Sequence, residues 1–140
     1  MGVALVALSA SAANAQEVDG ARVYATVCSS CHMANGQGVA GVFPPVAESE
    51  WVTGSPEQLV KIILHGVMGE MMVAGEVYSG MMPPWGGGLN DAEIAAVSTY
   101  IRSNFGNEAG PVTAEMVANL RKAHAARKTP WTAEELAAAK

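Results

Sequence analysis

The pentapeptide Cys28-Ser29-Ser30-Cys31-His32 constrains this chain more than any other part of its sequence. Two cysteines three positions apart, with a histidine directly after the second, form the attachment signature of a c-type haem. In this interpretation the two thiols add to the vinyl groups on one edge of the porphyrin, and the adjacent imidazole becomes an axial ligand of the iron. The motif therefore predicts one covalently attached haem c and a fold that can enclose it.

A CxxC pair has two other common uses, a zinc half-site and a redox-active dithiol. A structural zinc site needs a second pair of Cys or His ligands at similar spacing, and the chain has only two cysteines. A thioredoxin-like dithiol follows a strand, whereas no run of β-branched residues precedes Cys28. Composition also favours haem: with only 6% aromatic residues, a purely protein core would be thin, and a porphyrin would add apolar bulk.

The first fifteen residues have the pattern of a targeting segment. They are apolar and mostly small, and Ala13-Asn14-Ala15 supplies an A-x-A cleavage site before Gln16. The run is too short to span a membrane, and it lacks the usual basic start, which would fit a true start further upstream. We predict that residues 1–15 are a signal peptide, with an uncleaved anchor as the alternative. A cleaved signal places the mature chain in the periplasm, without an integral membrane span.

A first helix is predicted over residues 18–30, followed by a loop. Gly20 and Tyr24 lie at steps of four on the helix face that carries Cys28. Glycine inside a helix costs about 1 kcal/mol relative to alanine, so Gly20 indicates that another backbone approaches closely there. Residues 35–46 are too rich in glycine and proline for a helix or a central strand. They suit a loop folded over a flat cofactor.

A second helix has a clear beginning and a clear end. Ser55 can cap it, Pro56 fits its first position, and Gln58 can complete a capping box. Gly66 ends it, and the expected buried face consists of Leu59, Ile62 and Ile63.

A third helix begins at Asn90, where Glu93 at the third helical position can complete a capping box. Residues 104–107 break it. Its expected buried stripe consists of Ile94, Val97 and Ile101, with Tyr100 beside them. A helix of this length can cross the first one.

The segment between the second and third helices contains the candidates for the second axial ligand of the iron. Residues 67–80 have no sustained period and predict a loop or a short hairpin around Ala74-Gly75. Met81 and Met82 follow, directly before a proline, which restrains the preceding residue towards extended backbone. Neighbours in an extended chain point to opposite sides, so only one of the two thioethers can face a haem. We predict that Met82, and not Met81, is the second axial ligand.

From Gly110 the composition changes, and the role of this tail is open. Residues 17–106 carry three basic and nine acidic side chains, a net charge of −6, whereas residues 107–140 carry five basic and four acidic side chains, a net charge of +1, and the whole chain is −5. No basic run indicates nucleic-acid binding. The tail can fold back on the acidic body, contact a second protein or stay solvated. Thr132 and Glu135 form a capping-box pattern for a short last helix, and Trp131 before it can act as an apolar anchor.

Residues 20–106 resemble a single-haem class I cytochrome c of the bacterial periplasmic type. The resemblance rests on Gly20 and Tyr24, the motif at 28–32, Pro44 and Val46, Tyr78 to Pro83, and the helix from Leu89 to Gly106. It implies an all-α fold with three to five helices wrapped around one haem. It also implies a cytochrome domain over residues 16–107, with residues 108–140 as a C-terminal extension.

The same resemblance implies roles for individual residues. The carbonyl of Pro44 would accept a hydrogen bond from the haem-ligating His32, and Met82 would be the second axial ligand of the iron. An iron held by a histidine and a methionine has no open position for substrate, which implies an electron carrier and not an enzyme. The acidic body predicts redox partners with a positively charged docking patch.

Two other functions stay open at this stage. A haem enzyme or gas sensor would need a distal acid–base group, and His65 and His124 are the only histidines outside the motif. His65, just before a helix-ending glycine, is interpreted as a surface or capping histidine. The other alternative is the cytochrome subunit of a periplasmic dehydrogenase or reductase, because similar tails are found in such subunits.

Overall fold

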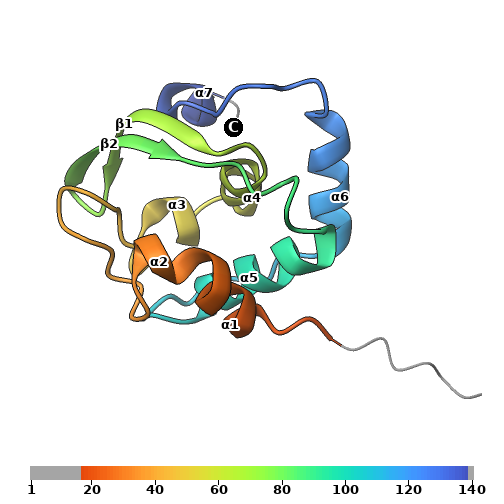
Figure 1. Ribbon diagram of the computed structural model, residues 1–140, viewed down its shortest axis with the longest axis horizontal. Coiled ribbons are helices and arrows are strands. Elements are labelled where there is room, and N and C mark those ends of the chain that lie inside the picture. Colours follow the sequence, from red (N-terminus) through yellow and green to blue (C-terminus); the bar gives the residue numbers. More distant parts are fainter. Residues whose placement is uncertain (1–16, 139–140) are drawn as a thin grey trace, which may run out of the picture.

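The computed structural model describes residues 17–138, so the predicted signal peptide at residues 1–15 lies outside the described residues. Helices surround a central helix, α4, and a two-stranded hairpin lies at one side of the molecule, beside α7 (Figure 1). The elements follow in the order α1 (Gly20–Val23), η1 (Tyr24–Cys28), α2 (Ser29–His32), α3 (Glu50–Thr53), α4 (Pro56–His65), β1 (Val67–Val73), β2 (Glu76–Met82), α5 (Asp91–Ser103), α6 (Ala114–Ala123) and α7 (Ala133–Ala138). Within the described range, no helix is long and apolar enough to cross a membrane.

The first three elements join into one helical rod that crosses α5. A single π-helical turn, η1, links α1 to α2 without a break in the chain's helical course. A Cβ atom on Gly20 would lie 2.2 Å from the carbonyl oxygen of Ala96 in α5, so the predicted close backbone approach is confirmed. One turn later Tyr24 is 3% exposed, and its ring packs against those of Tyr100 and Phe105. These contacts fix the rod against α5.

The predicted helix ends are confirmed except for one side chain. Asn90 and Glu93 form the complete capping box of α5. Ser55 caps α4 by accepting from the backbone of Gln58, with Pro56 in the first turn. The side chain of Gln58 does not complete that box: its Nε2 donates to the carbonyl of Leu136, 2.8 Å away in α7. The buried side-chain amide of Gln58 therefore hydrogen-bonds to a carbonyl of α7, far away in the sequence, and not to the backbone at the start of its own helix.

The predicted all-α fold class is wrong, because residues 67–82 form an antiparallel hairpin. The ladder runs in register from Val67 opposite Met82 to Val73 opposite Glu76. At its tip, Ala74 and Gly75 have φ of 49° and 83°, the left-handed pair that a tight hairpin turn of type I′ requires. The hairpin alternative predicted for this segment is thus confirmed. One face of it is buried, with Met71, Val73 and Tyr78 each at most 8% exposed.

The tail folds back on the body, and more helical segments are present than the three to five expected. Helix α6 packs on α4 and α5, and α7 packs on β1. Val117 and Leu136 are completely buried, and Trp131 is 7% exposed. Thr132 and Glu135 form the predicted capping box of α7. The fold-back alternative for the tail is confirmed.

A buried guanidinium ties the beginning of the tail to the helices. Arg102, in α5, is 5% exposed and donates to the carbonyls of Gly110, Val52 and Gly54 at 2.7, 2.6 and 3.0 Å. Burial lowers the pKa of Arg102, although three carbonyl acceptors satisfy much of its hydrogen-bonding capacity. One side chain thereby connects α3, α5 and the tail.

His65 lies under the tail and not free on the surface. It is partly buried at the end of α4, and its Nε2 lies 3.2 Å from the carbonyl oxygen of His124. The rings of both histidines meet Trp131 edge-on, and Arg127 lies over that indole, 3.5 Å from its centroid. The interpretation of His65 as a surface or capping histidine is therefore wrong, because the tail covers it.

We expect Gly20→Ala to destabilise the protein by about 1–3 kcal/mol, because its methyl group would overlap the Ala96 carbonyl and push the rod from α5. Gly87→Ala is the matched control, since a Cβ there meets nothing within 4 Å and Gly87 has no positive φ. Denaturant unfolding of both haem-loaded variants measures the difference. Equal stability of the two variants would contradict the close-approach reading.

We also expect stability to fall as the pH drops from about 7 towards 5. Burial lowers the pKa of both histidines in the folded state, and cations add to it: Arg127 and Arg121 near His65, and Lys61 and Arg127 near His124. The unfolded chain, with histidine pKa near 6.5, therefore takes up protons first, so acid favours unfolding until the folded pKa is passed.

The measurement is the melting temperature of the haem-loaded protein against pH. The double variant His65→Gln with His124→Gln should flatten the curve between pH 7 and 5. Glu135 titrates in a separate, more acidic window, because its bond to Arg127 lowers its pKa. An unchanged slope in the double variant would show that other groups set the pH dependence.

Candidate functional site

All five residues predicted to bind the cofactor line one cavity of about 230 Å³. Its wall includes Cys28, Cys31, His32, Pro44 and Met82. Most of the remaining wall is apolar and comes from α4, α5 and the hairpin: Leu59, Ile62, Ile63, Val67, Met71, Val73, Tyr78, Val97 and Ile101. The structure thus brings together residues that are up to 54 positions apart in the chain.

The imidazole of His32 is held in one tautomer. Its Nδ1 lies 2.7 Å from the carbonyl oxygen of Pro44. A carbonyl can only accept, so Nδ1 carries the hydrogen and Nε2 keeps its lone pair. Burial lowers the pKa of His32, against the opposing effect of the Pro44 bond. The result is a neutral, oriented imidazole with Nε2 free for a metal ion, as metal-binding histidines require.

The loop after the motif places the Pro44 carbonyl. The backbone N–H of Gly38 donates to the carbonyl of His32 at 2.9 Å, which folds the loop back on the end of α2. Val46 and Ala47 both donate to the carbonyl of Gly36, closing the loop a second time. A bridge between Val39 and Phe43 shapes its tip. The predicted glycine- and proline-rich loop is therefore ordered by its own backbone.

The two thiols lie on the final turns of the helical rod. Cys28 and Cys31 are partly exposed and do not form a disulfide. Burial, with a smaller contribution from Cys31, raises the pKa of Cys28 to about 11. Both side chains border the cavity, and Tyr24 fixes the end of the rod by donating from its hydroxyl to the carbonyl of Met33 at 2.7 Å. A protonated Cys28 is a poor ligand for a metal ion by itself.

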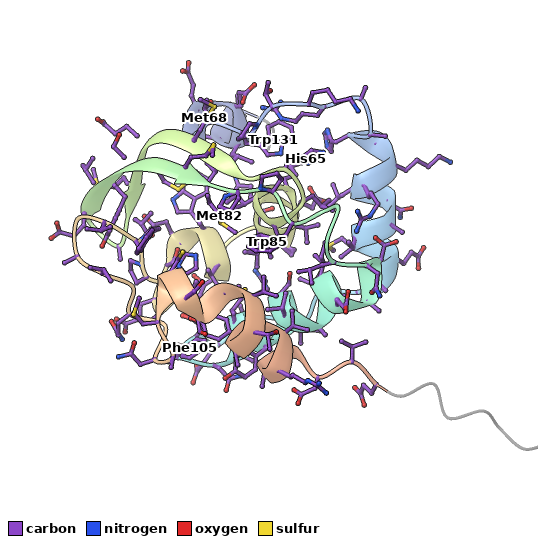
Figure 2. The ribbon with its side chains drawn as sticks, viewed as in Figure 1. His65, Met68, Met82, Trp85, Phe105 and Trp131 are labelled. Atoms are coloured by element: carbon purple, nitrogen blue, oxygen red, sulfur yellow. The ribbon has the colours of Figure 1, made fainter. Side chains whose placement is uncertain are left out.

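Met82 and Met81, neighbours in β2, both border the cavity but differ in exposure. Met82 is partly buried and packs against both hydrophobic clusters of the protein, and Figure 2 shows it in the interior between the hairpin and the helices. Met81 also borders the cavity but is 65% exposed. In the ladder, Met82 lies opposite Val67 and Met81 opposite Met68, whose side chain is 44% exposed.

The donor set fits a covalently attached haem better than a bare metal ion. The cavity combines two thiols, an oriented imidazole and a thioether within apolar walls. Haem c uses this combination, with the thiols on the porphyrin and the other two groups on the iron. In the part of the chain that the structure describes, no group of three or more His, Cys, Asp or Glu residues could hold a metal ion.

Some cavity residues were not predicted from the sequence. Trp51 borders the cavity, and its Nε1 donates to the backbone carbonyl of Met72 at 2.8 Å, which joins α3 to the hairpin. Ser49 is only 2% exposed and borders it as well. Tyr78 could have been found from the strand period, because it shares a face with Met82 four residues later. Nothing in the local sequence marks Trp51 or Ser49.

The comparisons with known proteins converge on one class. The family model described as cytochrome c oxidase, cbb3-type, subunit III matches residues 15–101. Cytochrome c-552 of Thermus thermophilus is 40% identical over 114 residues, covering 75% of this chain and 86% of that protein. The cytochrome c subunit of the quinone alcohol dehydrogenase of Gluconacetobacter polyoxogenes is 40% identical over 111 residues, covering 77% of this chain but 23% of that subunit. The gluconate 2-dehydrogenase cytochrome c subunit of Pantoea cypripedii is 37% identical over 107 residues, covering 74% and 24%.

Proposed function

This chain belongs to the cytochrome c family, and on that premise we propose that it carries one electron between redox proteins on a haem c held by Cys28, Cys31, His32 and Met82. The two cysteines would tether the porphyrin, and the histidine and the methionine would bind the iron. The observation that carries this assignment is the convergence of all four side chains on one apolar cavity.

The side chains of this protein prepare the cofactor for transfer without rearrangement. The haem supplies an iron that gains or loses one electron. The Pro44 carbonyl holds His32 in the tautomer that leaves Nε2 free, and the β-ladder holds Met82 in extended backbone. The soft thioether favours the reduced iron, and the apolar wall of α4 and α5 keeps water away. Cys28 and Cys31 are partly exposed, so a tether there leaves one edge near solvent.

We propose that the protein is a carrier and not an enzyme. With both His32 and Met82 as ligands, the iron would have no position for a substrate. Among the described residues that line the cavity, His32 is the only histidine, and no carboxylate is present. His65 and His124, the candidates for a distal acid–base group, lie together under the tail and do not border the cavity.

We further propose that the protein works in the periplasm, with residues 1–15 as its signal peptide. The A-x-A site before Gln16 supports this location. Residues 16–107 would then form the cytochrome domain, since they supply every proposed ligand, and residues 108–140 an extension packed on its surface. Haem c attachment on the far side of the cytoplasmic membrane agrees with export.

A second candidate function is that of a cytochrome subunit or domain within a larger dehydrogenase. The observation that favours it is the match to dehydrogenase cytochrome c subunits, of which this chain covers about a quarter. Val42 and Met81, both more than half exposed, border the cavity and suit a lasting apolar contact with another subunit. Co-purification of the tagged protein from its native source with a stoichiometric larger partner would favour this function over the free carrier.

For the free carrier, we propose docking to a positively charged patch on the partner. Two of the three cations within residues 17–106, Lys61 and Arg102, are buried, which leaves the surface of that region strongly acidic. Glu70 and Glu76 are exposed on the hairpin, and nine other residues of its two strands border the cavity. Acidic side chains beside the exposed edge of the haem would attract a cationic partner protein towards that edge.

The first prediction here concerns the sulfur ligand. Met82→Ala should abolish the sulfur-to-iron charge-transfer band of the oxidised protein. The reduction potential should fall by on the order of 0.1 V, because axial ligation spans about 0.8 V among haem proteins. The variant should also bind carbon monoxide when reduced, whereas the unaltered six-coordinate protein should not bind it readily.

Met81→Ala is the matched control, because it removes the neighbouring thioether from the same strand. It should leave the band, the potential and the carbon monoxide response unchanged. The ligand assignment is wrong if Met81→Ala removes the band and Met82→Ala leaves it in place.

The second prediction concerns docking. Electron exchange with a cationic redox protein should slow as salt rises, because exposed charges are screened within about 8 Å at physiological ionic strength. Glu70→Gln with Glu76→Gln should reduce this salt dependence. Glu115→Gln, an exposed carboxylate in α6, should change it less. Stopped-flow rates at several salt concentrations measure it, and a rate independent of salt would contradict the electrostatic docking.

A further inference from the structure

The segment that leaves Met82 runs directly across the end of α4. Trp85 donates from its backbone to the carbonyl of Ile63 at 2.9 Å, and Gly86 donates to that of Leu64 at 3.1 Å. At the helix end, a Cβ atom on Gly66 would lie 2.3 Å from the carbonyl oxygen of Met82. The position of the Met82 backbone is therefore set by the last turn of α4 and by whatever holds the following loop against it.

On one side of Met82, the tail extends the hairpin by one residue. Trp131 donates to the carbonyl of Gly66 at 2.9 Å and accepts from the N–H of Met68 at 2.8 Å, which makes a parallel bridge to Val67. Val67 pairs with Met82 on its other side. Trp131, Val67 and Met82 thus lie side by side across three chain segments, and the 7% exposed indole belongs to the cluster against which both of the others pack.

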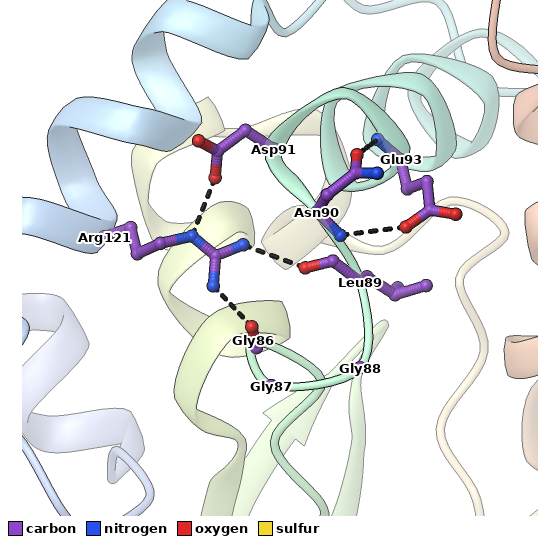
Figure 3. A pocket seen from close by; sticks show the side chains of 8 residues that line it. All are labelled: Gly86, Gly87, Gly88, Leu89, Asn90, Asp91, Glu93 and Arg121. Atoms are coloured by element: carbon purple, nitrogen blue, oxygen red, sulfur yellow. Dashed lines mark hydrogen bonds and ion pairs between the residues drawn. The ribbon is translucent and has the colours of Figure 1, made fainter.

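On the other side of Met82, an arginine of the tail holds the loop that follows. Figure 3 shows Arg121, from α6, pointing its guanidinium into the bend between Gly86 and Asp91. Its Nη1 donates to the carbonyl of Gly86, its Nη2 to that of Leu89 at 2.9 Å, and its Nε to the carboxylate of Asp91 at 2.7 Å. The planar guanidinium fits such an arrangement in a way that a lysine cannot.

This loop needs an external support. It contains three consecutive glycines, 86–88, which have the largest conformational freedom of any residue and no side chains to pack. The only hydrogen bonds that tie Gly86 to other elements within the described residues are those to Leu64 and to Arg121. Segments with so few contacts are the first to open locally in a folded protein. Because Met82 precedes this loop in the chain, such an opening would displace Met82 as well.

We propose that Arg121 and Trp131 are positioning residues for Met82, through which the C-terminal tail holds the thioether against the iron and opposes its replacement by other ligands. The inference rests on the proposed function, since it takes Met82 as the axial ligand. Neither tail residue borders the cavity, so each acts through the backbone that carries Met82.

The test uses imidazole as a competing ligand for the oxidised, haem-loaded full chain. Imidazole can bind only when the thioether has left, so its apparent affinity reports how often Met82 is released. Arg121→Gln removes the guanidinium and should raise that affinity about tenfold or more, the effect of losing one hydrogen bond made by a charged group. Trp131→Leu should act in the same direction. The sulfur-to-iron charge-transfer band reports the bound thioether during the titration.

Three control variants separate positioning from general stability. Lys122→Gln makes the same charge change at the adjacent, exposed position and should leave imidazole binding unaltered. Val117→Ala removes a buried side chain from α6 and should lower the melting temperature without changing imidazole affinity. Arg121→Lys keeps the charge but loses the planar arrangement of N–H donors, so its imidazole affinity should lie between those of the native protein and Arg121→Gln.

The outcomes are distinct. A rise in imidazole affinity in Arg121→Gln and Trp131→Leu, absent in Lys122→Gln and Val117→Ala, supports the proposal. It is overturned if Arg121→Gln behaves like Lys122→Gln, or if Val117→Ala raises the affinity as much. Met82→Ala shows which claim has failed: if that variant keeps the charge-transfer band, the ligand assignment is wrong. If it loses the band while the tail variants bind imidazole normally, only the positioning role is wrong. Should Trp131→Leu not fold, Arg121→Gln decides alone.

Discussion

The burial of helix α4 on every side is the constraint on which the rest of this structure depends. Each residue from Gln58 to Leu64 is buried. Leu59, Ile62 and Ile63 face the cavity, and the other side is covered by the tail, with Lys61 lying near the Trp131 ring. A helix of this kind is stable only when both sides are occupied, because its exposed apolar surface would otherwise meet water. With haem in the cavity, as proposed, haem and tail would complete the same core from opposite directions.

The parts of the site that could be predicted from sequence are those encoded over short distances. Spacing alone placed Cys28, Cys31 and His32 at one helical end, and the proline after Met82 predicted the extended backbone that β2 shows there. Cap signals placed the ends of two helices because a capping side chain reaches only three residues along the chain. The family resemblance added the partner of His32, and the 2.7 Å contact with Pro44 lies where the resemblance put it.

The parts that could not be predicted depend on contacts between distant segments. Glycines at 69 and 80 occupy inward positions of the hairpin, so the alternation that identifies a strand is lost. The sequence therefore left loop and hairpin open here, and the all-α class came from the family resemblance. Gln58 looked like a capping residue until α7 placed the carbonyl of Leu136 beside it. For the tail, composition suited a solvated segment as well as a packed one, and only the completed α4 surface distinguishes the two.

The proposed ligands are held in different ways, and this difference matters for redox behaviour. His32 is fixed by a bond to Pro44 within a short, self-bonded loop. Met82 is fixed by a strand, a helix end and a tail that come from three parts of the chain. Contacts of low local density open first when a protein fluctuates. The methionine side is thus the one through which remote changes would reach the iron, so substitutions in the tail would alter the potential and leave the histidine bond intact.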